Sequence, residues 1–161
     1  MRVLKDKEAA EAEVFLHKAA DLAKQATCQR SQCASIIVNN GVVIGTGVNT
    51  PPMELESQRR CKNSKSDYNI KITDKTCCIH AEQRAIMDAL RNNPDKIRGS
   101  RLYFFRLKNG IRTKAGKPYC TICSKMALDV GIIEFVLDHD EGIYVYDTQE
   151  YNDLSHEYLD E

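Results

Sequence analysis

The sequence predicts one α/β domain over residues 1–161, with three α/β/α layers and a mixed central sheet. Segments with helical and with strand periodicity alternate along most of the chain, which is typical of a sheet covered by helices. A turn signal joins two early strand-like segments, so we expect the sheet to contain an antiparallel pair. The length of 161 residues and the 42% of hydrophobic residues fit one compact core.

The first half of the chain predicts a helix, a hairpin and a long loop. Residues 7–26 are rich in Ala, Glu and Lys, and apolar residues recur there at helical spacing, namely Val14, Phe15, Ala19, Leu22 and Ala26. Residues 34–48 contain two β-branched runs around Asn39-Asn40-Gly41, which predicts an antiparallel hairpin. Residues 53–76 show no apolar periodicity and hold several Lys and Arg, so we expect a long basic loop, a feature that is often functional.

The second half predicts two further pairs of a helix and a strand. Asn92-Asn93-Pro94 ends the first of these helices, and Gly131 is a C-terminal cap for the second. The expected elements are helix 81–90, strand 102–107, helix 121–130, strand 132–137, a further strand 143–146 and a terminal helix 148–160. We therefore place the core of the domain at about 33–137 and an acidic, helical tail at 138–161.

Charge is unevenly distributed along a chain that is neutral overall. The 23 acidic residues balance the 23 Lys and Arg, but residues 138–161 hold nine acidic residues and no Lys or Arg. Residues 1–137 therefore carry a net charge of +9. A basic body suits an anionic ligand such as a nucleotide or a phosphate backbone, although a solvated surface gives the same count.

The sequence shows no export signal, and its cysteine usage also favours an intracellular location. The N-terminus is charged and no apolar run approaches the roughly 20 residues that cross a bilayer, so we expect a cytoplasmic location without membrane contact. Seven cysteines are an odd number for a closed disulfide framework. They favour metal ligands together with reduced thiols.

The strongest chemical signal combines His80 and Glu82 with Cys120 and Cys123. Imidazole and thiolate are ligands that zinc accepts in tetrahedral geometry. His80 precedes one predicted helix and the two cysteines open another, where free N–H groups and the helix dipole stabilise thiolates. Three protein ligands leave the fourth position for water, which is typical of a catalytic zinc. A carboxylate beside such a water is a suitable proton shuttle, and this is the role we expect for Glu82.

These motifs, H-x-E followed by Pro118-Tyr119-Cys120-Thr121-Ile122-Cys123, resemble the signature of the zinc-dependent nucleobase deaminases. From about Cys33 to Leu137 the chain is similar to the cytidine and deoxycytidylate deaminase superfamily, with the deoxycytidylate type as the best match. The resemblance implies a cytidine-deaminase-like fold, one zinc ion and hydrolytic removal of an amino group as ammonia. Glu82 would move protons from the attacking water to the ring and to the leaving amine.

The resemblance also implies substrate-binding residues and partners. Residues 45–52 are similar to a G-x-N-x-x-P loop, in which the Asn binds the sugar or the base, so Asn49 is the candidate for that role. We expect backbone groups near Ala81 to hold reacting groups and Tyr119 to line the pocket. Relatives commonly self-associate, so a homo-oligomer is expected.

Three functions stay open from the sequence. The leading one is deamination of a cytosine nucleotide or nucleoside, with dCMP first. The usual aromatic-Asn-Gly is Val48-Asn49-Thr50 here, and residues 109–117 are longer and more basic than such an enzyme needs. The second is therefore a deaminase of single-stranded DNA or tRNA, whose target base must leave the stack. The third is a non-catalytic zinc-binding module, for which Cys77 or Cys78 could supply a fourth ligand.

The remaining cysteines have two interpretations. Some members of the deoxycytidylate branch carry a second zinc near the substrate loop, and Cys28, Cys33 and Cys61 could contribute to one here. Free thiols are the simpler interpretation, which we favour from the sequence. Whether Cys77 or Cys78 takes part is left open.

Overall fold

The structure is a computed structural model of the chain and describes residues 1–158. Its seven strands form one sheet in the order β1-β7-β6-β4-β2-β3, with β5 paired to β4 beside this path. The strands are β1 (Arg2–Val3), β2 (Gln32–Asn39), β3 (Val42–Val48), β4 (Arg101–Lys108), β5 (Ile111–Thr113), β6 (Glu134–His139) and β7 (Gly142–Asp147). The helices are α1 (Asp6–Ala23), α2 (Ala81–Asn92), α3 (Thr121–Asp129) and α4 (Thr148–His156).

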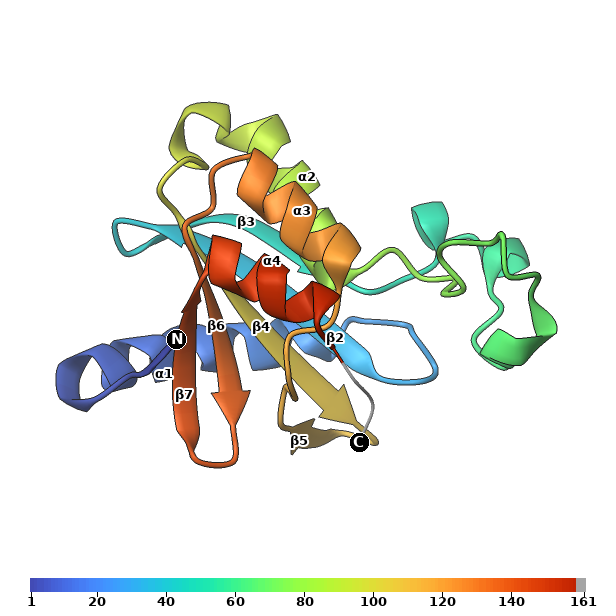
Figure 1. Cartoon of the computed structure of the whole chain (residues 1–161), viewed down its shortest axis with the longest axis horizontal. Helices are drawn as coiled ribbons and strands as arrows, with labels where there is room; N and C mark the ends of the chain where they lie inside the picture. Colours follow the sequence, from blue (N-terminus) through green and yellow to red (C-terminus); the bar gives the residue numbers. More distant parts are fainter. Residues whose placement is uncertain (159–161) are drawn as a thin grey trace.

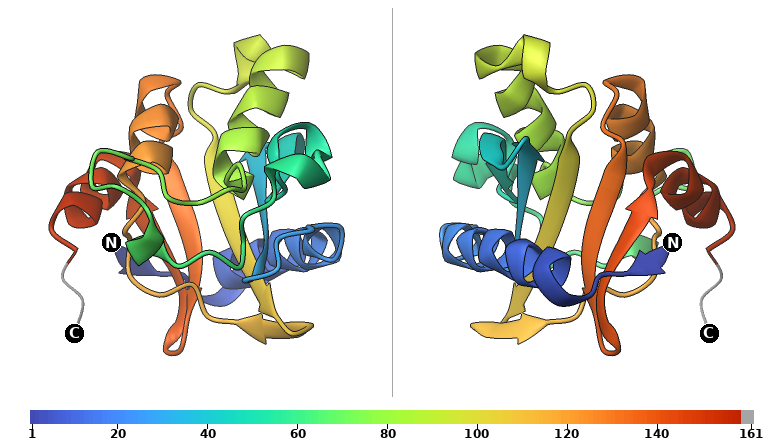
Figure 2. Two further views of the ribbon diagram at one scale, coloured as in Figure 1. Left: turned by 90° about the vertical axis from the view of Figure 1, so that its right-hand side faces the viewer. Right: turned by 90° about the vertical axis from the view of Figure 1, so that its left-hand side faces the viewer.

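Helices cover both faces of the sheet. Helix α1 packs on one face, whereas α2, α3 and α4 pack on the other (Figures 1 and 2). Strand β4 shows how the two cores are divided. Leu102 and Phe104 belong to the core under α2 to α4, while Tyr103 and Phe105 belong to the core under α1. This alternation follows from the two-residue period of a strand that is buried on both faces.

The sheet is mixed, as the sequence predicted. β2 pairs antiparallel with both β3 and β4, and β6 pairs antiparallel with β7. β4 and β6 run parallel, because the connection between them passes through α3 on the face of the sheet. The predicted three-layer α/β/α class is confirmed.

Two glycines of β3 let α2 approach the sheet closely. A Cβ added at Gly47 would lie 2.2 Å from the carbonyl oxygen of Ala81, and one added at Gly45 would lie 2.5 Å from that of Ala85. No side chain fits in either place. The first turn of α2 therefore rests directly on the backbone of β3.

Several element boundaries differ from the sequence prediction. Helix α1 ends at Ala23 and buries Leu16 and Ala12, whereas Val14, which we placed on the buried stripe, is 54% exposed. Strands β1 and β5, which pair with β7 and β4, were not predicted, because strands of two or three residues carry too little periodicity. The predicted terminal helix corresponds to α4, which ends at His156, and residues 159–160 of that prediction lie outside the described residues.

Residues 52–77, here called the projecting segment, extend away from the sheet (green, at the right of Figure 1). They contain three short 3-10 turns, Pro52–Glu54, Glu56–Gln58 and Lys65–Asp67, and no other helix or strand. The long basic loop predicted there is confirmed. Among the helices of residues 1–158, none combines the length and apolar character that a membrane span requires.

Candidate metal centre and active site

Three side chains from the starts of two helices meet at one point. His80 is the N-cap of α2, Cys120 is the N-cap of α3, and Cys123 lies in the first turn of α3. The His80 Nδ1 atom is 3.2 Å from Cys123 Sγ and 3.3 Å from Cys120 Sγ, and the two sulfur atoms are 3.1 Å apart. Zinc bonds of about 2.0–2.3 Å to nitrogen and sulfur can be made to all three atoms from one position between them.

Of the three donors, Cys120 is the one whose pKa is lowered below neutral. The pKa of Cys120 is lowered to about 4, first by its hydrogen bond with the Cys123 side chain and then by its hydrogen bond with His80. The pKa of His80 is raised to about 9 by its bond to Cys120, and that of Cys123 is raised by the same neighbour. Near pH 7 these shifts leave Cys120 as a thiolate, His80 as an imidazolium and Cys123 as a thiol, so a metal would displace a proton from each of the last two. The donor set fits zinc and, with three protein ligands, leaves room for water.

The outer nitrogen of His80 is held by the projecting segment. Thr76 Oγ1 lies 3.3 Å from His80 Nε2 and donates its own proton to Asp74 Oδ1 at 2.6 Å. If His80 held a metal through Nδ1, its ring proton would be on Nε2 and would be donated to Thr76 Oγ1. Such an outer contact fixes the orientation of a metal-ligating histidine.

Glu82 lies two residues after His80, in the first turn of α2, and is 7% exposed. Burial raises the pKa of its carboxyl group above the usual range, and the charge of His80 opposes this rise. A buried carboxyl group with a raised pKa beside a metal site is suited to accept and release protons.

A cavity of about 200 Å³ opens over these residues. His80, Glu82, Ala81 and Tyr119 line it, as do Asn49 and Phe104 and three basic residues, Arg30, Lys65 and Arg106. Three cations therefore face one carboxylate, Glu82. The structure brings every predicted site residue either into the group of three ligands or onto this cavity; the roles assigned to them remain predictions.

Asn49 is 8% exposed and fastens the start of β2. Its Oδ1 accepts a hydrogen bond from the Cys33 backbone at 2.7 Å, and its Nδ2 donates to the Ser31 carbonyl oxygen at 2.9 Å. Each amide group of this kind has one further acceptor position and one further N–H. These remaining positions are available at the cavity wall.

Arg106 was not among the predicted site residues. Its Nε is buried and has no hydrogen-bond partner within residues 1–158, and its guanidinium lies 5.5 Å from the ring centre of Phe104. The signal that could have found it is the strand period, which places residue 106 of β4 on the same face as Leu102 and Phe104. An arginine inside an apolar strand on that face indicates an anion or a buried partner.

The other cysteines also differ from the expectation. Cys28, Cys61 and Cys78 offer sulfur atoms within 4.8 Å of one another, whereas the Cys33 thiol contacts Ser31 Oγ at 3.6 Å and is not in this group. The suggestion that Cys33 belongs with Cys28 and Cys61 is therefore not supported, because Cys33 points into the active-site cavity from β2. All seven cysteines are free thiols in the structure.

Comparisons with solved structures agree with this fold. The dCMP deaminase of cyanophage S-TIM5, in complex with dCMP and dUMP, is similar with a TM-score of 0.56 and 21% identity over 82% of each chain. The cytidine deaminase of Burkholderia pseudomallei is similar with a TM-score of 0.56 and 16% identity over 86% of this chain and 94% of that one. At these identities the likeness shows the fold. No curated protein matches the chain by sequence.

A family model supplies the assignment that structural likeness alone does not. The model of the cytidine and deoxycytidylate deaminase zinc-binding region matches residues 9–138. The match covers most of the chain and includes His80, Glu82 and both cysteines of α3. This chain therefore belongs to the cytidine and deoxycytidylate deaminase family.

Proposed function

We propose that this protein is a zinc-dependent hydrolytic deaminase of a free cytosine nucleotide, of the dCMP type. The observation that carries the proposal is the convergence of His80, Cys120 and Cys123 beside the buried Glu82, in a cavity whose other charged residues are basic. A site that only stabilised the fold would not require a buried carboxylate next to three ligands.

His80, Cys120 and Cys123 would hold the zinc ion. When bound, zinc acts as a Lewis acid that makes water a nucleophile near neutral pH. Glu82 accepts a proton from the attacking water as the oxygen bonds to C4 of the cytosine ring. Glu82 then protonates ring nitrogen N3. In a later step it takes the second proton of the former water from the hydroxyl at C4 and delivers it to the departing amine. The C4–N bond breaks, ammonia leaves and the uracil carbonyl remains, so one water is consumed for each ammonia released.

The basic residues favour a substrate with a phosphate. Arg30 already donates to the carbonyl oxygens of Cys61 and Asn63, which leaves Arg106 as the cation with a buried, unpartnered N–H. A phosphate oxygen would satisfy this group, and charge-assisted hydrogen bonds of this kind are the stronger ones. The complex of the cyanophage enzyme with dCMP and dUMP supports the same substrate class.

The remaining predicted roles follow from the cavity walls. We propose that Asn49 contacts the sugar or the base through its unused amide positions, and that Tyr119, half exposed at the opening, covers the base. The cavity of about 200 Å³ is below the range of about 300–1,000 Å³ for drug-sized ligands. It would enclose one base, with the phosphate at its basic rim. The cytoplasmic location and the homo-oligomer remain predictions.

The test compares three substrates on the zinc-loaded protein: dCMP, deoxycytidine and a cytosine-containing single-stranded DNA. Ammonia release is expected with dCMP, with a much lower kcat/KM for deoxycytidine and none for the DNA. Release from the DNA alone would instead establish a polynucleotide deaminase. Release from none of them, in a protein that holds zinc, would remove the proposed substrate class.

Arg106→Met sharpens this test, because it keeps the bulk beside Phe104 and removes the charge. The kcat/KM for dCMP should fall about 10- to 100-fold, as expected for the loss of a charged hydrogen bond. The value for deoxycytidine should hardly change. Lys108→Met is the matched control, since Lys108 is an exposed cation at the end of the same strand. Equal losses with both substrates would show that Arg106 does not bind the phosphate.

A further inference from the structure

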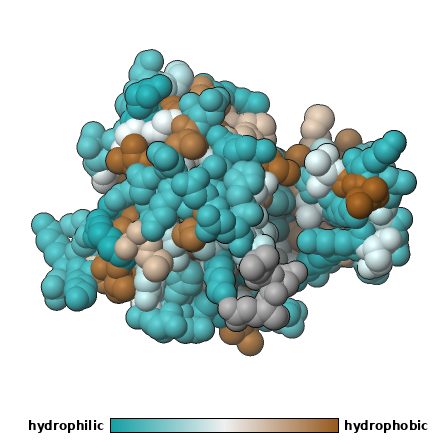
Figure 3. Space-filling model, in the orientation of Figure 1, coloured by the Kyte–Doolittle hydropathy of each residue, from teal (hydrophilic) through white to brown (hydrophobic). Residues whose placement is uncertain are grey.

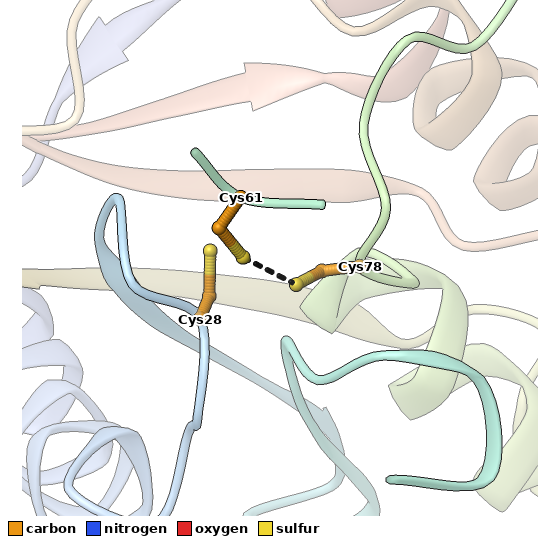
Figure 4. A group of neighbouring side chains, drawn as sticks. All are labelled: Cys28, Cys61 and Cys78. Carbon is orange, nitrogen blue, oxygen red and sulfur yellow. Dashed lines mark hydrogen bonds between the residues drawn. The ribbon is translucent and has the colours of Figure 1, made fainter. Parts of the chain in front are cut away.

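The walls of the catalytic cavity differ in how they are held. At one wall, Cys28, Cys61 and Cys78 point toward one another from three separate segments (Figure 4), and all three line the cavity. Beyond this contact the projecting segment is exposed, and Figure 3 shows hydrophobic side chains such as those of Met53 and Ile70 on its surface. Another wall is formed by Tyr119, which is supported in a different way.

The short stretch of residues 117–119 stands between two cavities. Tyr119 lines the catalytic cavity and is 50% exposed, whereas its neighbour Pro118 lines a second cavity of about 470 Å³. Tyr146, Leu154 and Tyr158 also line this second cavity. Open space offers no partner atoms, so a wall beside it lacks packing contacts on that side. The position of Tyr119 therefore depends on the contacts that its ring does make.

One of these contacts is an aromatic pair. The ring centres of Tyr119 and Tyr158 are 5.9 Å apart, and their ring planes are tilted by 56°. Aromatic rings attract one another at separations of about 4.5–7 Å when they are offset or tilted. Tyr158 is itself 43% exposed, so the core does not enclose its ring. The two rings thus support each other at the opening of the cavity.

Helix α4 provides a fixed base for this contact. The buried Tyr151 ring stacks on Phe135 of β6 with ring centres 4.0 Å apart, and Asn152 accepts a hydrogen bond from Ser124 of α3 at 2.8 Å. Tyr158 follows the end of α4 by two residues. The helix is therefore anchored both to the sheet and to the helix that carries two of the candidate metal ligands, and Tyr158 is placed from this anchored helix.

We propose that Tyr158 is a positioning residue for substrate binding, which holds the ring of Tyr119 over the opening of the catalytic cavity. The inference rests on the proposed function, from which it takes the role of Tyr119 in covering the base. Among residues 1–158, Tyr158 is not one of those that line the catalytic cavity, so it acts through Tyr119. Its loss should therefore weaken the enclosure of the base and leave the chemical step unchanged.

The first test needs no substrate. Hydroxyl-radical footprinting of the full-length protein, with peptide mass spectrometry, measures the exposure of Tyr119. Because half of Tyr119 is already exposed, its oxidation should rise by up to about 2-fold in Tyr158→Ala. Tyr158→Phe should behave as the wild type, since the ring makes the contact, and so should the control His156→Ala, an exposed residue at the end of α4. Unchanged oxidation of Tyr119 in Tyr158→Ala would overturn the proposal, whatever reaction the protein catalyses.

The second test separates binding from chemistry on the zinc-loaded protein with dCMP. Tyr158→Ala should raise KM about 3- to 10-fold, the size of a lost aromatic pair, and should leave kcat and zinc content unchanged. Tyr119→Ala should raise KM as well, and adding Tyr158→Ala to it should have no further effect, because the two residues act as one unit. Additive effects, or a fall in kcat together with zinc content, would show that Tyr158 supports the fold instead.

This inference and the proposed function fail in distinguishable ways. Ammonia release by the wild type, with an unchanged KM in Tyr158→Ala, would remove only the role of Tyr158. No ammonia release by the zinc-loaded wild type from dCMP or deoxycytidine would remove the proposed reaction and, with it, the role of Tyr158 in binding. A changed footprint would in that case still establish the contact between the two rings.

Discussion

Two thiol-rich groups share one cavity, but they are supported in opposite ways. His80, Cys120 and Cys123 stand at the starts of two helices whose inner faces are buried in the main core. Cys28, Cys61, Cys77 and Cys78 lie on loop backbone, and most of their sequence neighbours are exposed. The helices fix the geometry of the first group, whereas loop backbone carries the second. Similar side chains therefore stand on two kinds of support in one small domain.

This difference predicts that the first group keeps its arrangement when metal is removed, because the main core holds the two helix starts in place. The two groups are coupled at one point, where Thr76 of the projecting segment contacts His80. The three variants below separate the chemistry of the first group from this coupling and from general acid sensitivity.

The largest effect is expected for Glu82→Gln, which keeps the size of the side chain and removes its proton acceptor. The kcat should fall by about 10²–10⁴-fold, the usual contribution of a positioned acid–base group. Zinc content should stay as in the wild type, because Glu82 is not among the ligands. Steady-state ammonia release and metal analysis on the same sample provide the measurement, and a fully active variant would remove Glu82 from the mechanism.

A smaller effect is expected for Thr76→Val, which keeps the shape of the side chain and removes the oxygen beside His80 Nε2. The affinity of the catalytic site for zinc should fall about 10- to 100-fold, as is typical for outer contacts of ligating histidines. Competition with a chromophoric chelator measures this change. Thr73→Val is the control, since Thr73 is exposed in the same segment. Equal affinities for the two variants would show that Thr76 does not orient the ring.

The smallest effect is expected on the free energy of unfolding at low pH, where acid protonates both thiolates and the carboxylates of ion pairs such as that of Glu8. Hydrogen bonds from Arg2 and then Arg101 lower the pKa of Glu8 to about 2. Because the pKa is lower in the folded state, this carboxylate stabilises the fold above its unfolded pKa of about 4.5, and the contribution is lost as the pH falls toward 2. Its side chain is 36% exposed, so screening limits the contribution to about 0.5–1 kcal/mol.

Glu8→Gln therefore separates the loss of this ion pair in acid from the protonation of thiolates. The variant should be less stable than the wild type at pH 7 and should lose less stability between about pH 5 and 2. Urea unfolding of metal-free protein at several pH values measures this, and Glu11→Gln serves as an exposed control on the same helix. A parallel loss in both proteins would show that Glu8 is not the titrating group.

The sequence predicted the parts of this molecule that have a strong local signal. The Asn-Asn-Gly turn identified the β2–β3 hairpin, and the spacing around His80 and Cys120 identified the ligand set that the structure brings together. Both signals depend on residue types with few alternative uses. The position of Val14 was wrong, because a helix rich in alanine offers more than one apolar stripe and only tertiary packing selects Leu16.

The second thiol group could not be assembled from the sequence. Its members are separated by up to fifty positions and lie on loops, where no periodicity predicts which way a side chain points. The sequence therefore offered Cys33, the nearest cysteine to Cys28, where the structure places Cys78. Arg106 was missed for a different reason: the strand period was available, but a lone arginine in a strand is more often at a solvated edge.

The close packing of α2 on the two glycines of β3 limits the redesign of the cavity, because Ala81 at the start of α2 is one of its lining residues. A side chain at Gly47 would meet main-chain atoms of Ala81 and Ala85 and the Arg84 Cβ, and no change of neighbouring side chains removes the two main-chain atoms. Engineering toward a bulkier base would have to leave Ala81 in place and instead trim other lining residues, such as Phe104 or Tyr119. The side of the cavity formed by the start of α2 is thus rigid and carries the reacting groups, whereas lining side chains such as Phe104 and Tyr119 can be changed to alter selectivity.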